Sequence, residues 1–517
     1  MELQHLKENL ASVPGEKDTL INYDINSFGS LGIYYKSVFR HNSLLFFIGK
    51  KETEKSLYIL YDAGSKESEI FQGDIVSSGK TDLSLKKCPL NTQNRKAVQS
   101  IFPFTVASII GLKNSFGFGD RIGLANAGHL QALSGYDFYP VLAQQSIREL
   151  TRTGRSADEV MDAAVWAVFQ EGYTKGFSAD GDHLKTTEDI DLMVKAGYKI
   201  FTFDPGEYVE NNADVYDKED LLKTLKDYPW DKLGDSPEDA KKRYLNGPVK
   251  INDQFTIKVE ELALLKAYCK YGRSLAHVKK LYDHLKKAYA DYDSEVEVSV
   301  DETDSVTSVF EHFFISNELK RLGVEFVSLA PRFVGSFEKG IDYKGDLKLF
   351  EEEYKLHAAI AEHFGNYKIS LHSGSDKFSV YTVIGKLKKG FIHVKTAGTS
   401  YLEALKVVAV KQPDLFREIF DFSRGLYDDE KRTYHVSADL KKVKGGFDYK
   451  DNELPALFDS IDARQILHVT FGKVLSEKDK KGNYLFKDRI IECLKKYEET
   501  HYQILVKHFT RHLEPFK

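Results

Sequence analysis

Short apolar runs alternate with longer amphipathic stretches from about residue 105 to about residue 410. Candidate strands lie at 106–123, 139–146, 175–184, 198–205, 295–302, 325–332, 367–374 and 391–398. The first of these holds two overlapping possibilities, VASIIGL and SFGFGDRIG. Strands that alternate with helices are typical of parallel β-α-β units, and eight such units suit a closed barrel. The pattern therefore predicts an α/β fold, a (β/α)8 TIM barrel.

Three other regions depart from this alternation. Residues 1–105 hold short runs rich in β-branched and aromatic residues, which predict a β-rich accessory region. Within the predicted catalytic domain, 106–410, the stretch of about 206–294 is too long for one barrel helix and predicts an inserted helical segment. Residues 411–517 predict a mainly helical C-terminal extension packed on the barrel.

Two late strand-like pieces, 433–440 and 464–475, compete for places in the barrel. If they were barrel strands, the first two candidates would not be. We prefer the earlier eight strands, because the polar residues at their ends then follow a sensible order along the chain.

Composition excludes several classes of protein. The 517 residues carry a formal net charge of −5, so no basic excess favours nucleic acid. Three cysteines lie far apart, which suits a reducing cytoplasm better than a disulfide framework. The N-terminus lacks the apolar segment of a signal peptide, and no run of about 18 apolar residues predicts a membrane span. We expect a cytoplasmic protein with a small-molecule substrate, and the sequence is compatible with a homo-oligomer.

The chemistry of a barrel enzyme lies at the carboxyl ends of its strands. The third predicted strand ends in Asp182-His183, the fifth in Asp301-Glu302, and the seventh in His372. Two imidazoles and a carboxylate can converge on one divalent cation, and they suit Zn²⁺, Mn²⁺, Ni²⁺ or Co²⁺ better than Mg²⁺. We therefore expect a divalent metal ion bound by His183, His372 and Glu302, with Asp301 as the alternative third ligand. Zn²⁺ is the metal that we expect first among these.

Other polar residues near the strand ends are candidates for binding a substrate. Arg332 or Lys339 could hold a carboxylate, and the small residues of SLHSGSDK could cradle hydroxyls or an anion. A surface ion pair and an ordinary turn are the alternatives. The full set of expected substrate contacts is Gln144, Gln145, Arg332, Lys339, Ser373, Ser375, Asp376, Lys377 and His393.

Some motifs and histidines are less informative. GFGDRIG lacks both the GxGxxG spacing and a GK[ST] ending, so an ATP or NAD site is rejected. His435 and His468 could reach the site from a flanking element. His501, His508 and His512 lie on an amphipathic stretch and are expected to be packed or solvated.

The ordered phrases PVLAQQS, GFSADGDHL, EVEVSVDE, SLHSGSD and FIHVKTAGTS resemble the barrel of the class II aldolase superfamily. In its bisphosphate aldolases one strand ends in Asp-His, where the histidine binds metal and the aspartate moves protons. These positions match Asp182 and His183, and His372 matches a second metal ligand. Two departures argue against a bisphosphate aldolase. The third metal histidine has no counterpart in SLAPRFVG, and Asp376 stands in the phosphate loop.

Longer phrases, including SFGFGDRIGLANAGH, ADGDHLKT, APRFVGSFEKGIDYKGD, LHSGSDKFSVY and HVKTAGTSYLEAL, resemble the tagaturonate/fructuronate epimerases of hexuronate catabolism. The resemblance covers about 105–410 and implies an isomerase that interconverts D-tagaturonate and D-fructuronate. These two compounds differ in configuration at C4, the carbon β to the ketone. Neither the ketone nor the carboxylate acidifies the hydrogen on C4. Inversion there requires transient oxidation or retro-aldol cleavage and re-addition.

We favour the retro-aldol route, because the sequence shows no nicotinamide site. Asp182 is the candidate for moving the proton of the C4 hydroxyl, and Asp301 or Lys395 would serve the opposite face. Two alternatives stay open: a metal-dependent aldolase for ketoses or keto acids, and a non-catalytic aldolase accessory subunit.

Overall fold

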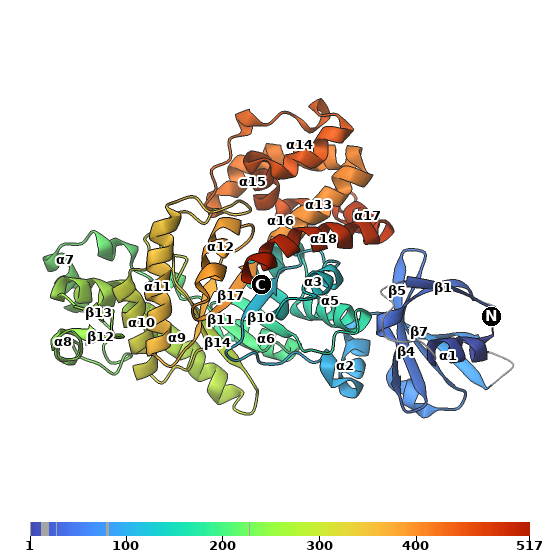
Figure 1. Cartoon of the computed structure of the whole chain (residues 1–517), viewed down its shortest axis with the longest axis horizontal. Coiled ribbons are helices and arrows are strands. Elements are labelled where there is room, and N and C mark those ends of the chain that lie inside the picture. The colour runs from blue at the N-terminus through green and yellow to red at the C-terminus, as the bar shows by residue number, and fades with distance from the viewer. Residues whose placement is uncertain (1, 12–19, 27, 79–81, 227) are drawn as a thin grey trace.

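The structure is a computed structural model, and it describes residues 2–11, 20–26, 28–78, 82–226 and 228–517. Its centre is a closed barrel of eight parallel strands (Figure 1). In chain order they are β8 (Ser115–Phe118), β9 (Tyr139–Ser146), β10 (Ser178–Leu184), β11 (Ile200–Phe203), β14 (Glu295–Ser299), β15 (Ser328–Ala330), β16 (Lys368–Leu371) and β17 (Phe391–Thr396). The predicted TIM barrel is confirmed, and its first strand comes from SFGFGDRIG rather than VASIIGL.

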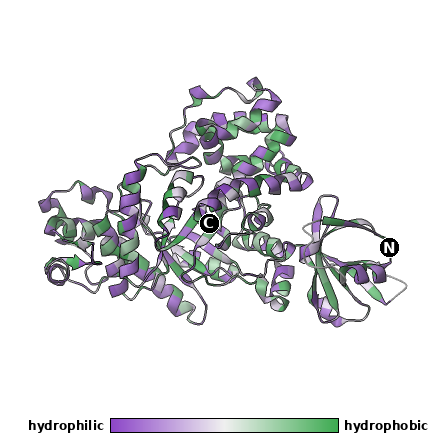
Figure 2. Cartoon of the chain, in the orientation of Figure 1, coloured by the Kyte–Doolittle hydropathy of each residue, from purple (hydrophilic) through white to green (hydrophobic). Residues whose placement is uncertain are grey.

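Helices surround the barrel, and most follow a strand. They are α3 (Asn126–Ala132), α4 (Ile147–Thr153), α5 (Ala157–Gln170), α6 (Thr187–Ala196), α10 (Val309–Arg321), α11 (Leu347–His363), α12 (Phe378–Leu387) and α13 (Thr399–Lys411). Figure 2 shows hydrophobic and hydrophilic bands along these helices, as expected for helices with one face on a core. Helix α5 starts with a capping box, in which Ser156 and Glu159 each accept from the other's backbone N–H.

The N-terminal region is a separate antiparallel sheet in the order β1-β2-β4-β5-β7-β6, with β3 paired to β4. Its elements are α1 (Leu3–Ala11), β1 (Leu20–Ile25), β2 (Gly29–Tyr34), β3 (Phe39–His41), β4 (Leu44–Lys51), β5 (Glu54–Asp62), β6 (Asp74–Ser78) and β7 (Leu83–Cys88). Strand alternation divides β4 between two cores. Leu45 and Phe47 pack in the core that includes α1, while Phe46 and Ile48 pack with Trp166 and Phe169 of α5. Helix α2 (Thr92–Ile101) leads to the barrel.

The inserted segment lies between β11 and β14. It consists of α7 (Lys218–Lys226), α8 (Pro237–Leu245), the short strands β12 (Val249–Lys250) and β13 (Thr256–Ile257), and the long helix α9 (Glu261–Ala288). His277 and Ser274 of α9 hydrogen-bond the carbonyls of Lys185 and Pro205. The insertion therefore supports the loops that follow β10 and β11.

The C-terminal extension is helical, and its last long helix packs against the barrel (Figure 1). It comprises α14 (Pro413–Glu430), α15 (Ile461–Val469), α16 (Phe471–Ser476), α17 (Lys487–Lys496) and α18 (Glu498–Leu513). The late strand-like pieces are not barrel strands: 464–475 lies in α15 and α16, and 433–440 is irregular. In the part of the chain that the structure describes, no helix is long and apolar enough to cross a membrane.

Candidate active site

A small cavity opens at the carboxyl ends of the barrel strands. It collects side chains from six of the predicted strand ends and from the C-terminal extension. The predicted residues that line it are Gln144, Asp182, His183, Asp301, Glu302, Lys339, His372, Ser373, Ser375 and Lys395. The candidates for catalysis and for metal binding thus share one cavity.

Asp182 and His183 both reach this cavity because the strand that carries them is irregular. Adjacent residues of a regular strand point to opposite faces. The register of β10 against β11 shifts between Gly181 and Leu184, and His183 has a φ of 51°. Such a bulge redirects side chains, and bulges are frequent beside active sites. The irregularity therefore brings a carboxylate and an imidazole to the mouth together.

His183 is held by two carboxylates. Its Nδ1 lies 3.2 Å from Asp204 Oδ2, and its Nε2 lies 3.8 Å from Asp182 Oδ1. Burial lowers the pKa of His183, but the charge of Asp182 and the hydrogen bond to Asp204 outweigh it and raise the pKa to about 10. Without another cation, this imidazole is protonated at neutral pH.

His372 has a matching arrangement. Its Nε2 lies 2.7 Å from Glu297 Oε1, and its Nδ1 lies 3.0 Å from Asp301 Oδ1. The two imidazole rings, His183 and His372, lie with their centroids 5.1 Å apart. Burial lowers the pKa of His372, but Asp301 outweighs it and raises the pKa to about 9. The carboxylates at the mouth therefore carry an excess of negative charge, and protonation of both histidines partly neutralises it.

Lys395 lies in a cage of carboxylates, two of which also contact the histidines. Its Nζ is 2.7 Å from Asp180 Oδ2, 2.8 Å from Asp182 Oδ1 and 2.7 Å from Glu297 Oε1. Burial alone would lower the pKa of Lys395, but these carboxylates raise it well above its usual value. Burial would raise the pKa of Asp182, yet the Lys395 ammonium holds it well below its usual range. Asp182 is therefore a carboxylate at neutral pH.

Replacing Lys395 by methionine is expected to destabilise the fold, because three buried carboxylates lose their shared cation. Breaking a buried ion pair from one side costs about 3–5 kcal/mol in free energy of unfolding. Lys355→Met is the matched control, since Lys355 makes a half-exposed pair with Glu351 on α11, and should cost under about 0.5 kcal/mol. Urea unfolding measures both. A loss below about 1 kcal/mol for Lys395→Met would argue against the charged cage.

Five predicted substrate contacts lie outside the cavity: Gln145, Arg332, Asp376, Lys377 and His393. Gln145 points the opposite way from Gln144 on β9, and its Nε2 donates to the Asp120 carbonyl. His393 lies two residues before Lys395 on β17, deeper in the barrel, with its Nδ1 2.9 Å from Ser115 Oγ. Burial lowers the pKa of His393 to about 3, so it is a neutral part of the interior.

The other three are engaged elsewhere. Lys377 donates to three backbone carbonyls, and Asp376 faces the C-terminal helices. Arg332 lines a neighbouring hollow with Phe333 and Ser336, which borders the cavity through Lys339 and Ser373.

Several residues of the site had no clear signal in the sequence. Asp204 follows β11 and holds His183, but its Asp-Pro pair resembles an ordinary turn. Arg121 comes from the loop after β8, Arg148 from the first turn of α4, and Tyr434 from the irregular segment after α14. Of the flanking histidines, His468 lines the cavity, and His435 lines only the neighbouring hollow. His501, His508 and His512 are buried, in agreement with the packed alternative.

The parallel barrel and its mouth of imidazoles and carboxylates define an enzyme of the TIM-barrel class. The model of the family UxaE, tagaturonate epimerase, matches residues 34–516. The chain therefore belongs to the tagaturonate epimerase family, and it is an isomerase that acts on carbohydrates. The family resemblance found in the sequence is confirmed.

The similarity to named relatives covers nearly the whole chain. The tagaturonate/fructuronate epimerase of Thermotoga maritima is 41% identical over 485 residues, which cover 93% of this chain and 96% of that protein. A one-glycerol complex of the fructuronate-tagaturonate epimerase UxaE from Cohnella laeviribosi superposes with a TM-score of 0.88 at 35% identity, covering 99% of each chain. The native structure of that enzyme gives a TM-score of 0.88 at 36% identity, covering 94% and 96%.

Proposed function

We propose that this enzyme interconverts D-tagaturonate and D-fructuronate with a divalent metal ion, by retro-aldol cleavage and re-addition. The observation that carries the proposal is the convergence of imidazole and carboxylate groups at the mouth. Possible ligand atoms of His183 and Glu302 lie within 4.8 Å of each other, and Asp204, which belongs to the same group, holds the His183 ring. His372 and Asp182 lie beside them in the same cavity. A barrel mouth with this donor set suits a Lewis-acid mechanism on a small polar substrate.

The residues fit a metal ion in a second respect. Metal-binding histidines usually donate their other ring nitrogen to a carboxylate or carbonyl, which fixes the tautomer. Asp204 accepts from Nδ1 of His183, and Glu297 accepts from Nε2 of His372. The other nitrogen of each ring faces a carboxylate of the cavity, Asp182 for His183 and Asp301 for His372, and an ion could bind between them. We assign the ion to His183, His372 and Glu302, with Asp301 as the alternative to Glu302. Zn²⁺ is our first choice for this nitrogen and oxygen set.

A carboxylate substrate accounts for an otherwise isolated cation. Lys339 lines the cavity and donates to Ser373 Oγ at 2.6 Å. Among the described residues, no carboxylate lies within ion-pair distance of its ammonium. The carboxylate of a hexuronate would supply the missing counter-ion. Arg148, which is 3.7 Å from Glu302, lies in the same cavity and can support it.

The amide of Gln144 can bind the hydroxyls of the substrate. It lines the cavity at 1% exposure, and neither its Oε1 nor its Nε2 has a hydrogen-bond partner. Leaving such a buried amide unpaired is costly, and a polyol can both donate to it and accept from it. Ser375, in the loop after β16, adds a hydroxyl to the lining of the cavity.

The chain's own residues would move the protons of the reaction. The metal ion would polarise the ketone and stabilise negative charge on the neighbouring oxygens. Asp182, kept ionised by Lys395, takes the proton of the C4 hydroxyl as the C3–C4 bond breaks, and it returns the proton after the aldehyde has rotated. Asp301 or Lys395 serves the epimer whose hydroxyl points the other way.

Deuterium at C4 of tagaturonate distinguishes this route from its rivals. The retro-aldol route never breaks the C4–H bond, so the fructuronate formed should keep all the deuterium, with no primary isotope effect on kcat. NMR of the product and competitive rate measurements give both quantities. Loss of deuterium would indicate deprotonation at C4, and a large isotope effect with retention would indicate transient oxidation. Either result would contradict the proposed route.

A further inference from the structure

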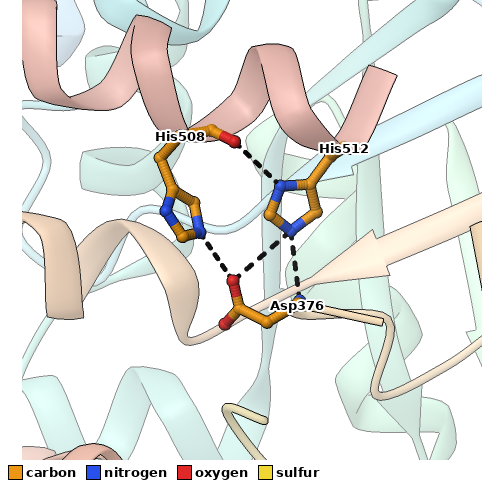
Figure 3. A group of neighbouring side chains, drawn as sticks. All are labelled: Asp376, His508 and His512. Atoms are coloured by element: carbon orange, nitrogen blue, oxygen red, sulfur yellow. Dashed lines mark hydrogen bonds and ion pairs between the residues drawn. The ribbon is translucent and has the colours of Figure 1, made fainter. Parts of the chain in front are cut away.

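A buried network of charged side chains joins α18 to the loop after β16 (Figure 3). The Asp376 carboxylate lies 2.6 Å from His508 Nε2 of α18 and 2.6 Å from Arg464 Nη2 of α15. The backbone N–H of Asp376 donates to His512 Nε2 at 3.1 Å. All four residues are buried. The C-terminal extension therefore contacts this loop through both the backbone and the side chain of Asp376.

The group of Asp376, His508 and His512 also has the spacing of a metal site, with ligand atoms within 4.8 Å. Its hydrogen bonds argue against that role. His512 Nδ1 donates to the His508 carbonyl at 3.2 Å, so its Nε2 is the acceptor for Asp376 and its lone pair is occupied. Arg464 also places a permanent positive charge against the carboxylate that would bind the ion. The group is an ion-pair network.

The same network extends to a second loop. Arg464 Nε donates to the Gly340 carbonyl at 2.8 Å. Lys377 Nζ donates to the carbonyls of Glu338 at 2.8 Å and Ile341 at 2.5 Å. We call Asp376, Lys377, Arg464 and His508 the C-terminal clamp. It fixes the loop 338–341 against the loop 373–377.

Both clamped loops carry side chains of the active-site cavity, and Ser375 of the second loop is one of them. Lys339 lies in the first loop and Ser373 in the second, and they are hydrogen-bonded at 2.6 Å. The second loop has an unfavourable backbone, since Ser373 and Asp376 have φ of 52° and 63°. Non-glycine residues keep such conformations only where their surroundings hold them there. The clamp supplies that restraint.

We propose that Arg464 and His508 are positioning residues of the epimerase. Acting through Asp376 and Lys377, they hold Lys339 and Ser373 where the substrate carboxylate binds. This inference rests on the proposed function, which assigns the carboxylate to Lys339. It gives the C-terminal extension a role in substrate binding, although Arg464 and His508 do not line the cavity.

The first test compares two identical substitutions in the extension. Arg464→Lys keeps the charge but loses the planar fork that joins Asp376 to Gly340. The control is Arg417→Lys, because Arg417 is equally buried at 8% exposure and pairs with Asp414 and Asp451, away from the cavity. For Arg464→Lys we expect KM for tagaturonate to rise about tenfold while kcat changes less. Arg417→Lys should leave both unchanged. Melting temperatures show whether the two variants lose similar stability.

The second test is a double-mutant cycle with Lys339→Met. If the clamp acts through Lys339, Arg464→Lys should raise KM less than about twofold in the Lys339→Met background. An equal rise in both backgrounds, or an equal rise for Arg417→Lys, would overturn the clamp. If Lys339→Met itself left KM unchanged, the proposed carboxylate site would fail, and the clamp with it. His508→Gln enters the same cycle if Arg464→Lys does not fold.

Discussion

His183→Ala is expected to lose metal binding and epimerase activity together, and His372→Ala should do the same. Each removes one of the two imidazoles assigned to the metal and leaves carboxylates that bind a transition metal less well. A metal that polarises a carbonyl contributes several kcal/mol to transition-state stabilisation, so kcat/KM should fall by about 10³-fold or more. Metal content by mass spectrometry and turnover of tagaturonate are the two measurements.

His284→Ala is the matched control for these variants. His284 lies on α9, where it pairs with Asp191 at the surface, and its loss should change neither metal content nor turnover. Full activity in His183→Ala protein that contains no metal would contradict the proposed site. Loss of activity with unchanged metal content would place His183 in another role.

Asp182→Asn is expected to keep the metal and lose turnover. The substitution preserves the shape of the side chain but removes the carboxylate that takes the C4 hydroxyl proton. A positioned acid-base group contributes about 10²–10⁴-fold, and kcat should fall by that factor while KM changes little. Because Asp182 also pairs with Lys395, Asp180 and Glu297 must then balance that ammonium alone. Stability should therefore be measured alongside the kinetics.

The control is Asp283→Asn, which removes a carboxylate from a half-exposed pair with Lys279 on α9. It should leave kcat and metal content unchanged. Asp182→Asn protein with full epimerase rates would show that another group moves the proton, and Asp301 would be the next candidate.

The barrel could be predicted because its strands follow a regular order of apolar runs and polar ends. The same regularity located Asp182, Asp301, His372 and Lys395, since parallel strands bring their carboxyl ends to one mouth. Strand alternation also accounts for Glu297, which lies on the same face of β14 as Ser299 and contacts His372 and Lys395.

The rest depended on features that no local pattern encodes. Ser373 and Asp376 have positive φ although neither is glycine, so the loop after β16 turns Asp376 and Lys377 away from the cavity. His393 and Lys395 both point into the barrel. They differ in depth, because Lys395 lines the cavity at the mouth and His393 lies further inside. Tyr434 and His468 come from an extension whose packing depends on long-range contacts, which one sequence does not reveal.

Metal dependence of the epimerisation is the central claim, and one measurement tests it most directly. The purified protein is stripped with a chelator, Zn²⁺, Mn²⁺, Ni²⁺ or Mg²⁺ is returned singly, and the conversion of tagaturonate is followed by chromatography. We predict that fructuronate forms only after a transition metal is returned and that no smaller fragment accumulates. Undiminished conversion by protein shown to contain no metal would contradict the account.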